Sequence, residues 1–237
     1  MKAIKLDAYL ETANFKNPMS FQSKESYFLP PFSTVIGMVH VACGFKSYHA
    51  MDVSVAGSSF STVHDLATRY EFNPTTAYDK ARHQMQVYSP KKEKMIGVTQ
   101  GVSHIHLITD LYLQFHIIPE DQSEVDFIAN KLKNPTQFLS LGRHEDTMLI
   151  NSVKVVEVKE QVLANDYEFT KAMYVPVSYQ IGGAFYRLNK NYELVEQKKK
   201  KYRKFNKKEV LYAGEGTIIP EKKLIWMDEE GEVLFPV

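Results

Sequence analysis

The stretch from Ile105 to Ile117 alternates apolar and polar side chains, and only Thr109 interrupts the apolar series. Successive side chains of a β-strand point to opposite faces of its sheet, so this alternation predicts a long strand. A strand with two such different faces belongs in a sheet that buries one side and leaves the other polar. We therefore expect a long central strand whose apolar face is covered by other segments.

Two helices are predicted by apolar residues that recur at i, i+3, i+4 and i+7. The first begins near Ser33 or Thr34, whose side chains can cap it, and Gly44 can end it in a left-handed conformation. The second begins at Ser123 and stops at Asn134-Pro135. Their core-facing stripes are Val35, Met38, Val39 and Ala42 in the first helix, and Val125, Ile128, Ala129 and Leu132 in the second.

Further strands are predicted at 4–10, 53–57, 138–141 and 148–158, the last two around a turn at Gly142. The order strand, helix, strand, long excursion, strand, helix, strand predicts an α+β, ferredoxin-like βαββαβ domain over residues 1–160. RNA-recognition modules share this architecture (RRM-like), with both helices on one sheet face and the other face left for a ligand or partner. Residues 161–237 are predicted to form a small β-rich C-terminal extension.

Charge is spread unevenly along the chain. The formal net charge is +1, from 29 Lys and Arg against 28 Asp and Glu, which argues against a protein that is basic throughout. Residues 198–208 read KKKKYRKFNKK, with eight basic residues and no acid, and without them 21 basic residues face 28 acidic ones. The chain is thus an acidic body of net charge −7 with a cationic strip, a pattern that indicates binding to phosphate or another anionic surface.

Several classes are disfavoured by the composition. The single cysteine, Cys43, allows no intrachain disulfide and no cysteine-based zinc site, so a reducing, cytoplasmic location is expected. The first residues form no signal-peptide core, and no apolar run approaches the roughly 18 residues of a membrane span. We find no P-loop, Rossmann glycine motif or nucleophile elbow, and we expect neither a cofactor nor a metal.

Two motifs carry a resemblance to a known family. Residues 27–38, YFLPPFSTVIGM, are similar to an N-terminal signature YxxPPxSTxxG, and residues 138–145, FLSLGRHE, are similar to an LGRxE turn. Both signatures belong to the Cas-five family of CRISPR-associated proteins, in the RAMP superfamily. The resemblance covers residues 1–160 well and the remainder loosely. Chain length and the long central excursion resemble the type I-B branch.

The resemblance implies a non-catalytic, RNA-binding subunit of a Cascade surveillance complex used in antiviral defence. Such a subunit caps the backbone of the complex and holds the 5′ handle of the crRNA. Its β-hairpin thumb contacts the RNA and packs against the backbone subunit, and here residues 60–104 take the place of the thumb. The partners implied are crRNA, the Cascade backbone and large subunits, and target DNA as a further candidate, with no membrane.

The candidate RNA contacts fall in three groups, each with a structural alternative. At the first helix, Ser33, Thr34 and Gly37 can receive a phosphate, or serve only as caps and a packing glycine. In the basic excursion, Arg and Lys can hold phosphates while Tyr88 or His83 stacks on a base, or the segment is a solvated loop. Its candidates, together with one from the preceding basic loop, are Lys24, Arg69, Arg82, His83, Gln84, Tyr88, Lys91, Lys92 and Lys94.

The third group is the turn Gly142, Arg143 and His144, where Arg143 can contact phosphate or pair with Glu145 or Asp146. The cationic strip has two interpretations as well: a solubilising loop, or a phosphate-tracking surface for the handle or for target DNA. Its candidate residues are Lys198, Lys199, Lys200, Lys201, Arg203 and Lys204.

Two alternative functions are weighed against RNA binding alone. The type I-C branch of the family is a metal-independent endoribonuclease that processes precursor crRNA and presents Lys and His as neighbours. This sequence has no Lys-His dipeptide, and the nearest substitutes are Arg82-His83 with Tyr48 or His49. Arginine stays protonated and is a poor general base, which favours a non-catalytic protein. The other alternative is a protein–protein scaffold with an incidental basic strip.

Overall fold

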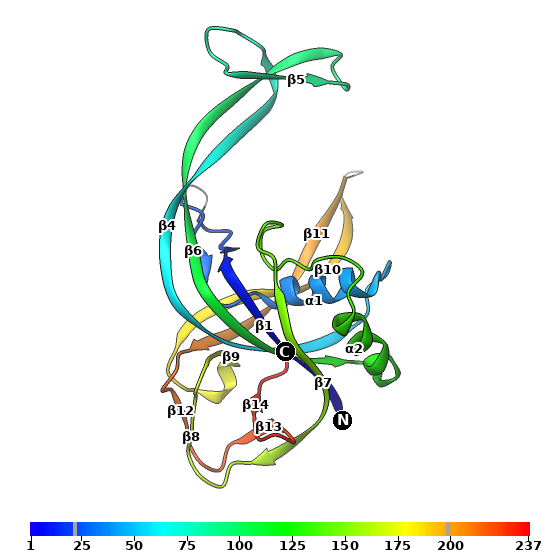
Figure 1. Cartoon of the computed structure of the whole chain (residues 1–237), viewed down its shortest axis with the longest axis vertical. Helices are drawn as coiled ribbons and strands as arrows, with labels where there is room; N and C mark the ends of the chain where they lie inside the picture. The colour runs from blue at the N-terminus through cyan, green and yellow to red at the C-terminus, as the bar shows by residue number, and fades with distance from the viewer. Residues whose placement is uncertain (21–22, 198–199) are drawn as a thin grey trace.

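The computed structural model describes residues 1–20, 23–197 and 200–237. Of the described residues, 57% lie in strands and 12% in helices. Ten strands form one sheet in the order β10-β11-β9-β4-β6-β1-β7-β13-β14, with β5 paired to β6 outside this path. Every pairing in it is antiparallel, and the sheet curls around helix α1 (Figure 1).

The strands of this sheet are β1 (Lys2–Ala13), β4 (Met51–Ala77), β5 (Met85–Ser89), β6 (Lys94–Pro119), β7 (Leu149–Val162), β9 (Ala172–Pro176), β10 (Ala184–Gln197), β11 (Lys200–Ala213), β13 (Leu224–Asp228) and β14 (Val233–Leu234). Two small sheets pair β2 (Phe15–Lys16) with β3 (Ser26–Tyr27), and β8 (Tyr167–Glu168) with β12 (Ile218–Ile219). The helices are α1 (Phe32–Cys43), α2 (Val125–Lys133), and the short 3-10 helices η1 (Gln122–Glu124) and η2 (Val177–Tyr179).

The main core lies between the centre of the sheet and the two α-helices. The apolar face of β1 supplies Ile4, Leu6 and Leu10, which are fully buried, and both predicted helical stripes face this core. Gly44 ends α1 with a left-handed φ of 69°. None of the helices in the described parts of the chain is long and apolar enough to cross a membrane.

The predicted helix caps are wrong in detail. The cap position of helix α1 is Pro31, two residues before Ser33, and no side chain caps the helix, so Ser33 and Thr34 lie inside its first turn. Proline fits there because its fixed φ suits the entry into a helix. Ser123 does not serve as the cap of α2. The side chain of Asp121 instead accepts the backbone N–H of Ser123, at the start of the 3-10 helix η1 that precedes α2.

The prediction of an α+β, ferredoxin-like domain with a small β-rich extension is wrong, because the chain is mostly β and builds one curled sheet. Strands β9, β10 and β11 continue the sheet beyond β4, while β13 and β14 continue it beyond β7. The sequence obscured these strands because residues in β10 and β11 are largely exposed on both faces. Without a buried face there is no alternation of apolar and polar residues to detect.

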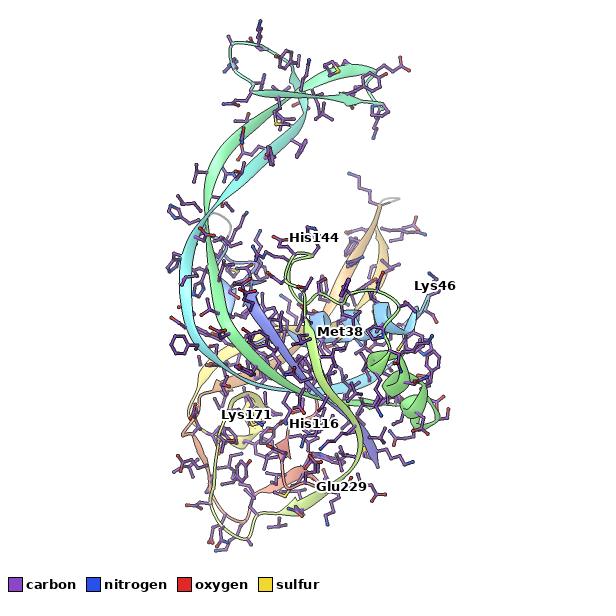
Figure 2. All side chains as sticks on the ribbon, in the orientation of Figure 1. Met38, Lys46, His116, His144, Lys171 and Glu229 are labelled. Atoms are coloured by element: carbon purple, nitrogen blue, oxygen red, sulfur yellow. The ribbon has the colours of Figure 1, made fainter. Side chains whose placement is uncertain are left out.

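Strands β4 and β6 continue past the body as a two-stranded ribbon, with β5 paired to β6 near its tip (Figure 1). Their pairing runs from Met51 opposite Pro119 to Phe72 opposite Val98, and after a register shift it ends with Ala77 opposite Ile96. The apolar pattern predicts a strand that ends at Gly57, whereas β4 extends to Ala77. The predicted excursion is therefore mostly paired β-structure with largely exposed side chains, apart from buried residues such as Ile96 and Val98, and Figure 2 shows its side chains projecting into solvent.

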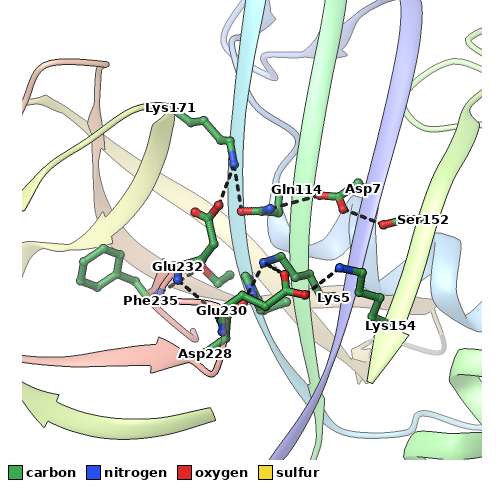
Figure 3. Close-up of polar contacts among 12 residues, drawn as sticks. Lys5, Asp7, Gln114, Ser152, Lys154, Lys171, Asp228, Glu230, Glu232 and Phe235 are labelled. Atoms are coloured by element: carbon green, nitrogen blue, oxygen red, sulfur yellow. Dashed lines mark hydrogen bonds and ion pairs between the residues drawn. The ribbon is translucent and has the colours of Figure 1, made fainter. Parts of the chain in front are cut away.

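The sheet face opposite the helices is not left open at the end near Lys5. The C-terminal segment covers it, and His116, expected on a polar surface, is 2% exposed. The buried carboxylate of Asp228 accepts hydrogen bonds from Lys5 Nζ at 2.9 Å and His116 Nε2 at 3.0 Å (Figure 3). Burial disfavours the charge on Asp228, but these bonds and the backbone N–H of Glu232 hold its pKa well below the usual range.

Candidate nucleic-acid interface

A cleft of about 420 Å³ lies at the base of the ribbon. Its walls come from the segment after β1, the N-terminus of α1, the Gly142 turn and the first ribbon residues beyond the body. Among its lining residues are four predicted site residues from three separate segments, namely Lys24, Thr34, Gly142 and Arg143. The fold thus gathers at one place residues that are more than a hundred positions apart in the sequence.

The backbone of Lys24 is fixed against β6. Asn14 Nδ2 donates to the carbonyl oxygen of Lys24 at 2.8 Å and to that of His106 at 2.6 Å. Lys24 itself has a left-handed φ of 44°, which marks a sharp change of chain direction. Asn14 is buried, so its amide pins the loop carrying Lys24 to the base of the ribbon.

The Gly142 turn is organised by the buried carboxylate of Asp146. This carboxylate accepts the backbone N–H groups of Asn14 and Arg143, both at 3.1 Å, and Arg143 Nε at 2.9 Å. Gly142 has a φ of 104°, and a Cβ there would lie 2.8 Å from the carbonyl oxygen of Asn14, so the turn requires glycine.

The structure therefore pairs Arg143 with Asp146, the ionic alternative considered for this residue. The hydrogen bond to Asp146 raises the pKa of Arg143 despite partial burial, and the guanidinium also lies 3.3 Å from Glu145. A quarter of the Arg143 side chain remains exposed at the cleft. His144, next to it, is 97% exposed and points away from the body above the turn (Figure 2).

The N-terminus of α1 opens onto the same cleft through Pro31 and Thr34. Because Pro31 supplies no side-chain acceptor, this helix end has no side-chain cap. One turn further on, Gly37 is exposed, and a Cβ added to it would meet no atom within 4 Å. Packing within the chain therefore does not explain a glycine that costs about 1 kcal/mol relative to alanine inside a helix.

The candidates in the excursion lie near the tip of the ribbon, away from the cleft. From Thr68, at the cleft, to Ala77 the ribbon advances roughly 20 Å, because the paired strand runs only from Val102 to Ile96 at about 3.3 Å per residue. Within the described residues, no carboxylate lies within salt-bridge distance of the exposed tip cations Arg82, Lys91, Lys92 and Lys94. Arg69, by contrast, pairs with Glu71 at 2.8 Å. Tyr88 is exposed beside these cations.

His83 and Gln84 have structural contacts at the tip. The backbone N–H of Asp79 donates to His83 Nδ1 at 3.0 Å, and the His83 ring covers Gly97 so closely that a Cβ there would lie 2.4 Å from the ring. Gln84 Oε1 accepts the backbone N–H of Gln100 at 3.4 Å. His83 therefore packs within the tip and helps to hold its fold.

The substitutes considered for an endoribonuclease are not brought together. His49 Nδ1 lies 2.7 Å from Glu124 Oε1, and its ring stacks on Phe45 with centroids 3.7 Å apart, just beyond the C-terminal end of α1. His83 lies at the tip of the ribbon. Among the described residues, no group of three or more His, Cys, Asp or Glu is arranged to hold a metal.

Sequence reasoning missed two residues that shape the cleft, Asn14 and Lys16. Lys16 lies in β2 and adds a third cation beside Lys24 and Arg143. The basic, polar character of residues 14–24 was the available signal, but nothing in it revealed that this segment faces the Gly142 turn. In the cationic strip, Lys198 and Lys199 lie outside the described residues, and Lys200, Lys201, Arg203 and Lys204 belong to β11.

Solved structures of CRISPR proteins share this fold. A chain of a structure described as a "CRISPR RNA-guided surveillance complex" aligns with a TM-score of 0.56 and 16% identity, covering 94% of this chain and 91% of that one. A CRISPR protein from Archaeoglobus fulgidus aligns with a TM-score of 0.50 and 12% identity, covering 99% and 98%. At these identities the likeness concerns the fold alone. No curated protein matches the chain.

The sequence itself identifies the family. The family model for CRISPR-associated protein (Cas_Cas5) matches residues 3–180, which is well over half of the chain. The protein therefore belongs to the Cas5 family of CRISPR-associated proteins, and the family resemblance carried by the two motifs is confirmed. The type I-B branch stays a prediction.

Proposed function

We propose that this protein is a non-catalytic, RNA-binding subunit of a CRISPR effector complex of type I-B. In this proposal it holds the 5′ handle of the crRNA, caps the backbone of the complex and acts in the cytoplasm. Membership of the Cas5 family supports a role in such a complex. The fold shared with a chain of an RNA-guided surveillance complex agrees with it.

The observation that carries the RNA assignment is the composition of the cleft. Lys16, Lys24 and Arg143 converge there with the uncapped N-terminus of α1, against one acidic lining residue, Glu145. The N–H of Thr34 already donates to the Pro31 carbonyl at 2.9 Å, so the helix end favours a phosphate through its dipole. Lysine and arginine supply the charge that holds nucleic acid. Exposed Gly37 continues this surface and leaves space for a sugar-phosphate backbone to approach the helix.

The ribbon offers a different surface on each side. At its base, Ala67 and Ile105 line the cleft. On the opposite face, exposed apolar side chains follow one another up the strands: Leu66, Tyr70, Phe72 and Val102. A two-stranded ribbon is marginally stable by itself in water, so we assign this apolar face to the backbone subunit. The cations at the tip would then hold the RNA further along its path.

RNA binding can be tested with the purified protein and a labelled RNA carrying the handle. Replacing Lys16 and Lys24 by Gln should weaken binding, and the salt dependence of log K should fall by about 0.7 for each phosphate of a single strand that the variant no longer neutralises. The matched control replaces two exposed lysines on the body, Lys46 and Lys159. Equal affinities of the two variants would contradict the cleft assignment.

The non-catalytic assignment has its own test. Repeat RNA incubated with the protein in EDTA should remain intact, and site-specific cleavage would establish the endoribonuclease instead. Absence of RNA binding at low salt, both by the protein alone and within its complex, would favour the scaffold interpretation.

A further inference from the structure

Strands β10 and β11 form a second projecting hairpin, which we call the basic hairpin (residues 184–197 and 200–213). It lies at the edge of the sheet, next to α1, and projects apart from the ribbon (Figure 1). Its register pairs Tyr192 with Phe205 and Gln197 with Lys200. Beyond Asn191 both strands are largely exposed, so this part of the hairpin contributes little to the core.

The cations of this hairpin are distributed over both of its faces. Because side chains alternate along a strand, Lys201 and Arg203 project from one face, and Lys200 and Lys204 project from the other. Each face also carries exposed aromatic residues, Tyr192 and Phe205 on the first and Tyr202 on the second. A solubilising loop has no need of this ordered, two-sided arrangement on paired strands.

These cations are not neutralised by the protein. Glu193 is opposite Lys204 and Glu196 is opposite Lys201, yet within the described residues no carboxylate lies within 4 Å of the four cations. Lys190, nearer the body, does form an ion pair with Asp52. Four exposed positive charges within five residues, with no carboxylate in ion-pair contact, leave the hairpin able to bind an external anion.

The aromatic contacts hold one of these cations in place. The Arg203 guanidinium lies over the Tyr192 ring, 4.5 Å from its centroid, and Phe205 meets the same ring edge-on at 5.8 Å. Stacking restricts a flexible side chain before any ligand arrives, which lowers the entropy cost of binding. The guanidinium is thereby presented outward from a fixed position, in a geometry suited to phosphate.

We propose that the basic hairpin enters the major groove of duplex DNA. The major groove of B-DNA is about 12 Å wide and admits a two-stranded β-ribbon, whose strands are about 4.8 Å apart. The groove has a phosphate strand on each wall, so a hairpin standing between the walls meets phosphates with both faces. A single strand lying against the hairpin would engage one face and leave the cations of the other unused.

The same reasoning separates DNA from RNA. The major groove of A-form RNA is too narrow for side chains to read, so the hairpin would meet only the outside of an RNA duplex. Lysine contacts to phosphates carry no sequence information, so the binding is sequence-independent. The site goes beyond the RNA-binding function and does not depend on it, because it shares none of the residues assigned to the cleft or the ribbon.

The test compares a 20-base-pair DNA duplex, an RNA duplex of the same sequence and the single strands, by fluorescence anisotropy with the full-length protein over a range of salt concentrations. The DNA duplex should bind at least tenfold more tightly than the other ligands. Replacing all four cations by Gln should lower the slope of log K against log salt by about 3.6, at about 0.9 per phosphate contact. The variants are K200Q, K201Q, R203Q and K204Q.

Two paired variants test the two-face geometry. Lys201→Gln with Arg203→Gln, and Lys200→Gln with Lys204→Gln, should each lower the slope by about 1.8. A control with Lys46, Lys133, Lys159 and Lys222 replaced by Gln keeps the same net charge as the quadruple variant and should retain DNA binding. Thermal melting checks that every variant is folded.

Three results would overturn the proposal: an effect confined to one pair, equal binding of the DNA and RNA duplexes, or equally weakened DNA binding in the control and in the hairpin variant. Handle RNA serves as an independent readout. The hairpin variants should bind it like the wild type, whereas Lys16→Gln with Lys24→Gln should weaken it and leave duplex DNA binding intact. Failure of one function is thus distinguishable from failure of the other.

Discussion

His64 and His106 stack across the two strands where the ribbon leaves the body, with ring centroids 5.0 Å apart and an interplanar angle of 21°. The backbone N–H of Ser26 lies 3.4 Å from His106 Nδ1, and the His106 carbonyl accepts from Asn14. The imidazole pair therefore sits beside the contacts that hold the Lys24 loop. The protonation state of His106 is therefore coupled to the contacts that hold the base of the ribbon.

This pair predicts a loss of stability in acid. Burial is the largest cause that lowers the pKa of His106, and a positive charge on His64 lowers this pKa further. Since the folded pKa lies below the unfolded value of about 6.5, the unfolded state binds more protons, and stability is lost as pH falls from about 6.5 through the folded pKa. His64→Gln should reduce the drop in Tm between pH 7.5 and pH 5 by about 2 °C, equivalent to roughly 1 kcal/mol.

The comparison between wild type and variant isolates this pair. The pKa of His40 is also lowered, chiefly by burial, but His40 belongs to α1 and is present in both proteins. Its contribution cancels in the difference. An identical pH dependence of Tm in the two proteins would show that His64 does not contribute to the acid sensitivity assigned to His106.

The buried ion pair of Asp228 predicts a large effect on stability. Asp228→Asn removes the buried one of the two carboxylates that contact Lys5, which is itself 4% exposed, and breaking a buried ion pair costs about 3–5 kcal/mol. Urea unfolding followed by circular dichroism measures this free energy. Glu230→Gln is the matched control, because Glu230 also contacts Lys5, at 2.8 Å, but is 40% exposed and should contribute much less to stability than Asp228.

Equal destabilisation in the two variants would contradict the distinction between buried and exposed carboxylates. The folded pKa of Asp228 is depressed, so its contribution is present above the ordinary carboxyl pKa of about 3.9 and is lost as pH falls below it. The wild type should therefore lose part of its advantage over Asp228→Asn at pH 3.

Gly37 predicts a trade-off between stability and binding. Gly37→Ala should stabilise α1 by about 1 kcal/mol, because the site is exposed and the added Cβ meets no neighbour. If RNA approaches the helix there, the same methyl group should weaken binding of handle RNA. Thermal melting and filter binding on one sample measure the two effects, and a stabilised protein with unchanged RNA affinity would remove Gly37 from the interface.

Gly142→Ala provides the contrast, since its backbone is left-handed and the Cβ would collide with the carbonyl of Asn14. This substitution should destabilise the turn and lower Tm. The two glycines lie in the two family motifs, so the comparison shows which one is kept for the fold and which for contact with RNA.

The sequence pattern located those elements that bury one face, and it failed where both faces are exposed. The alternation of Ile4, Leu6 and Leu10 and the stripe containing Val35 and Val39 correctly identified β1 and α1, because burial imposes a period on the sequence. The ribbon and the basic hairpin carry no such period. Their strands are defined by pairing across the sheet, and one sequence does not record pairing.

The candidate site was predicted in pieces for a related reason. Thr34, Arg143 and Lys24 were singled out by motif or charge, but only the fold shows that they line one cleft. Asp146 was considered solely as an ionic partner, whereas it also fixes the backbone of Asn14 and of the Gly142 turn. The contact of His83 with Gly97 could not be predicted because it forms across the ribbon tip, and an RNA contact of His83 stays a prediction.

The tip cations predict a loss of RNA binding without a loss of folding. Arg82→Ala with Lys91→Ala removes two exposed charges that have no carboxylate partner among the described residues, so Tm should stay within about 2 °C of the wild type. Retention of crRNA and assembly of the complex should weaken. The salt slope for single-stranded RNA should fall by about 1.4, at about 0.7 per phosphate.

His83→Ala is the variant to compare with it, because His83 lies between Arg82 and Lys91 in the sequence but packs on Gly97. It should loosen the tip, which hydrogen exchange of the amides at residues 79–97 would report, and its effect on RNA should follow from that loosening. A double variant that assembles normally, with wild-type salt dependence, would show that the tip of the ribbon does not grip RNA, and the apolar face of the ribbon would then be its functional surface.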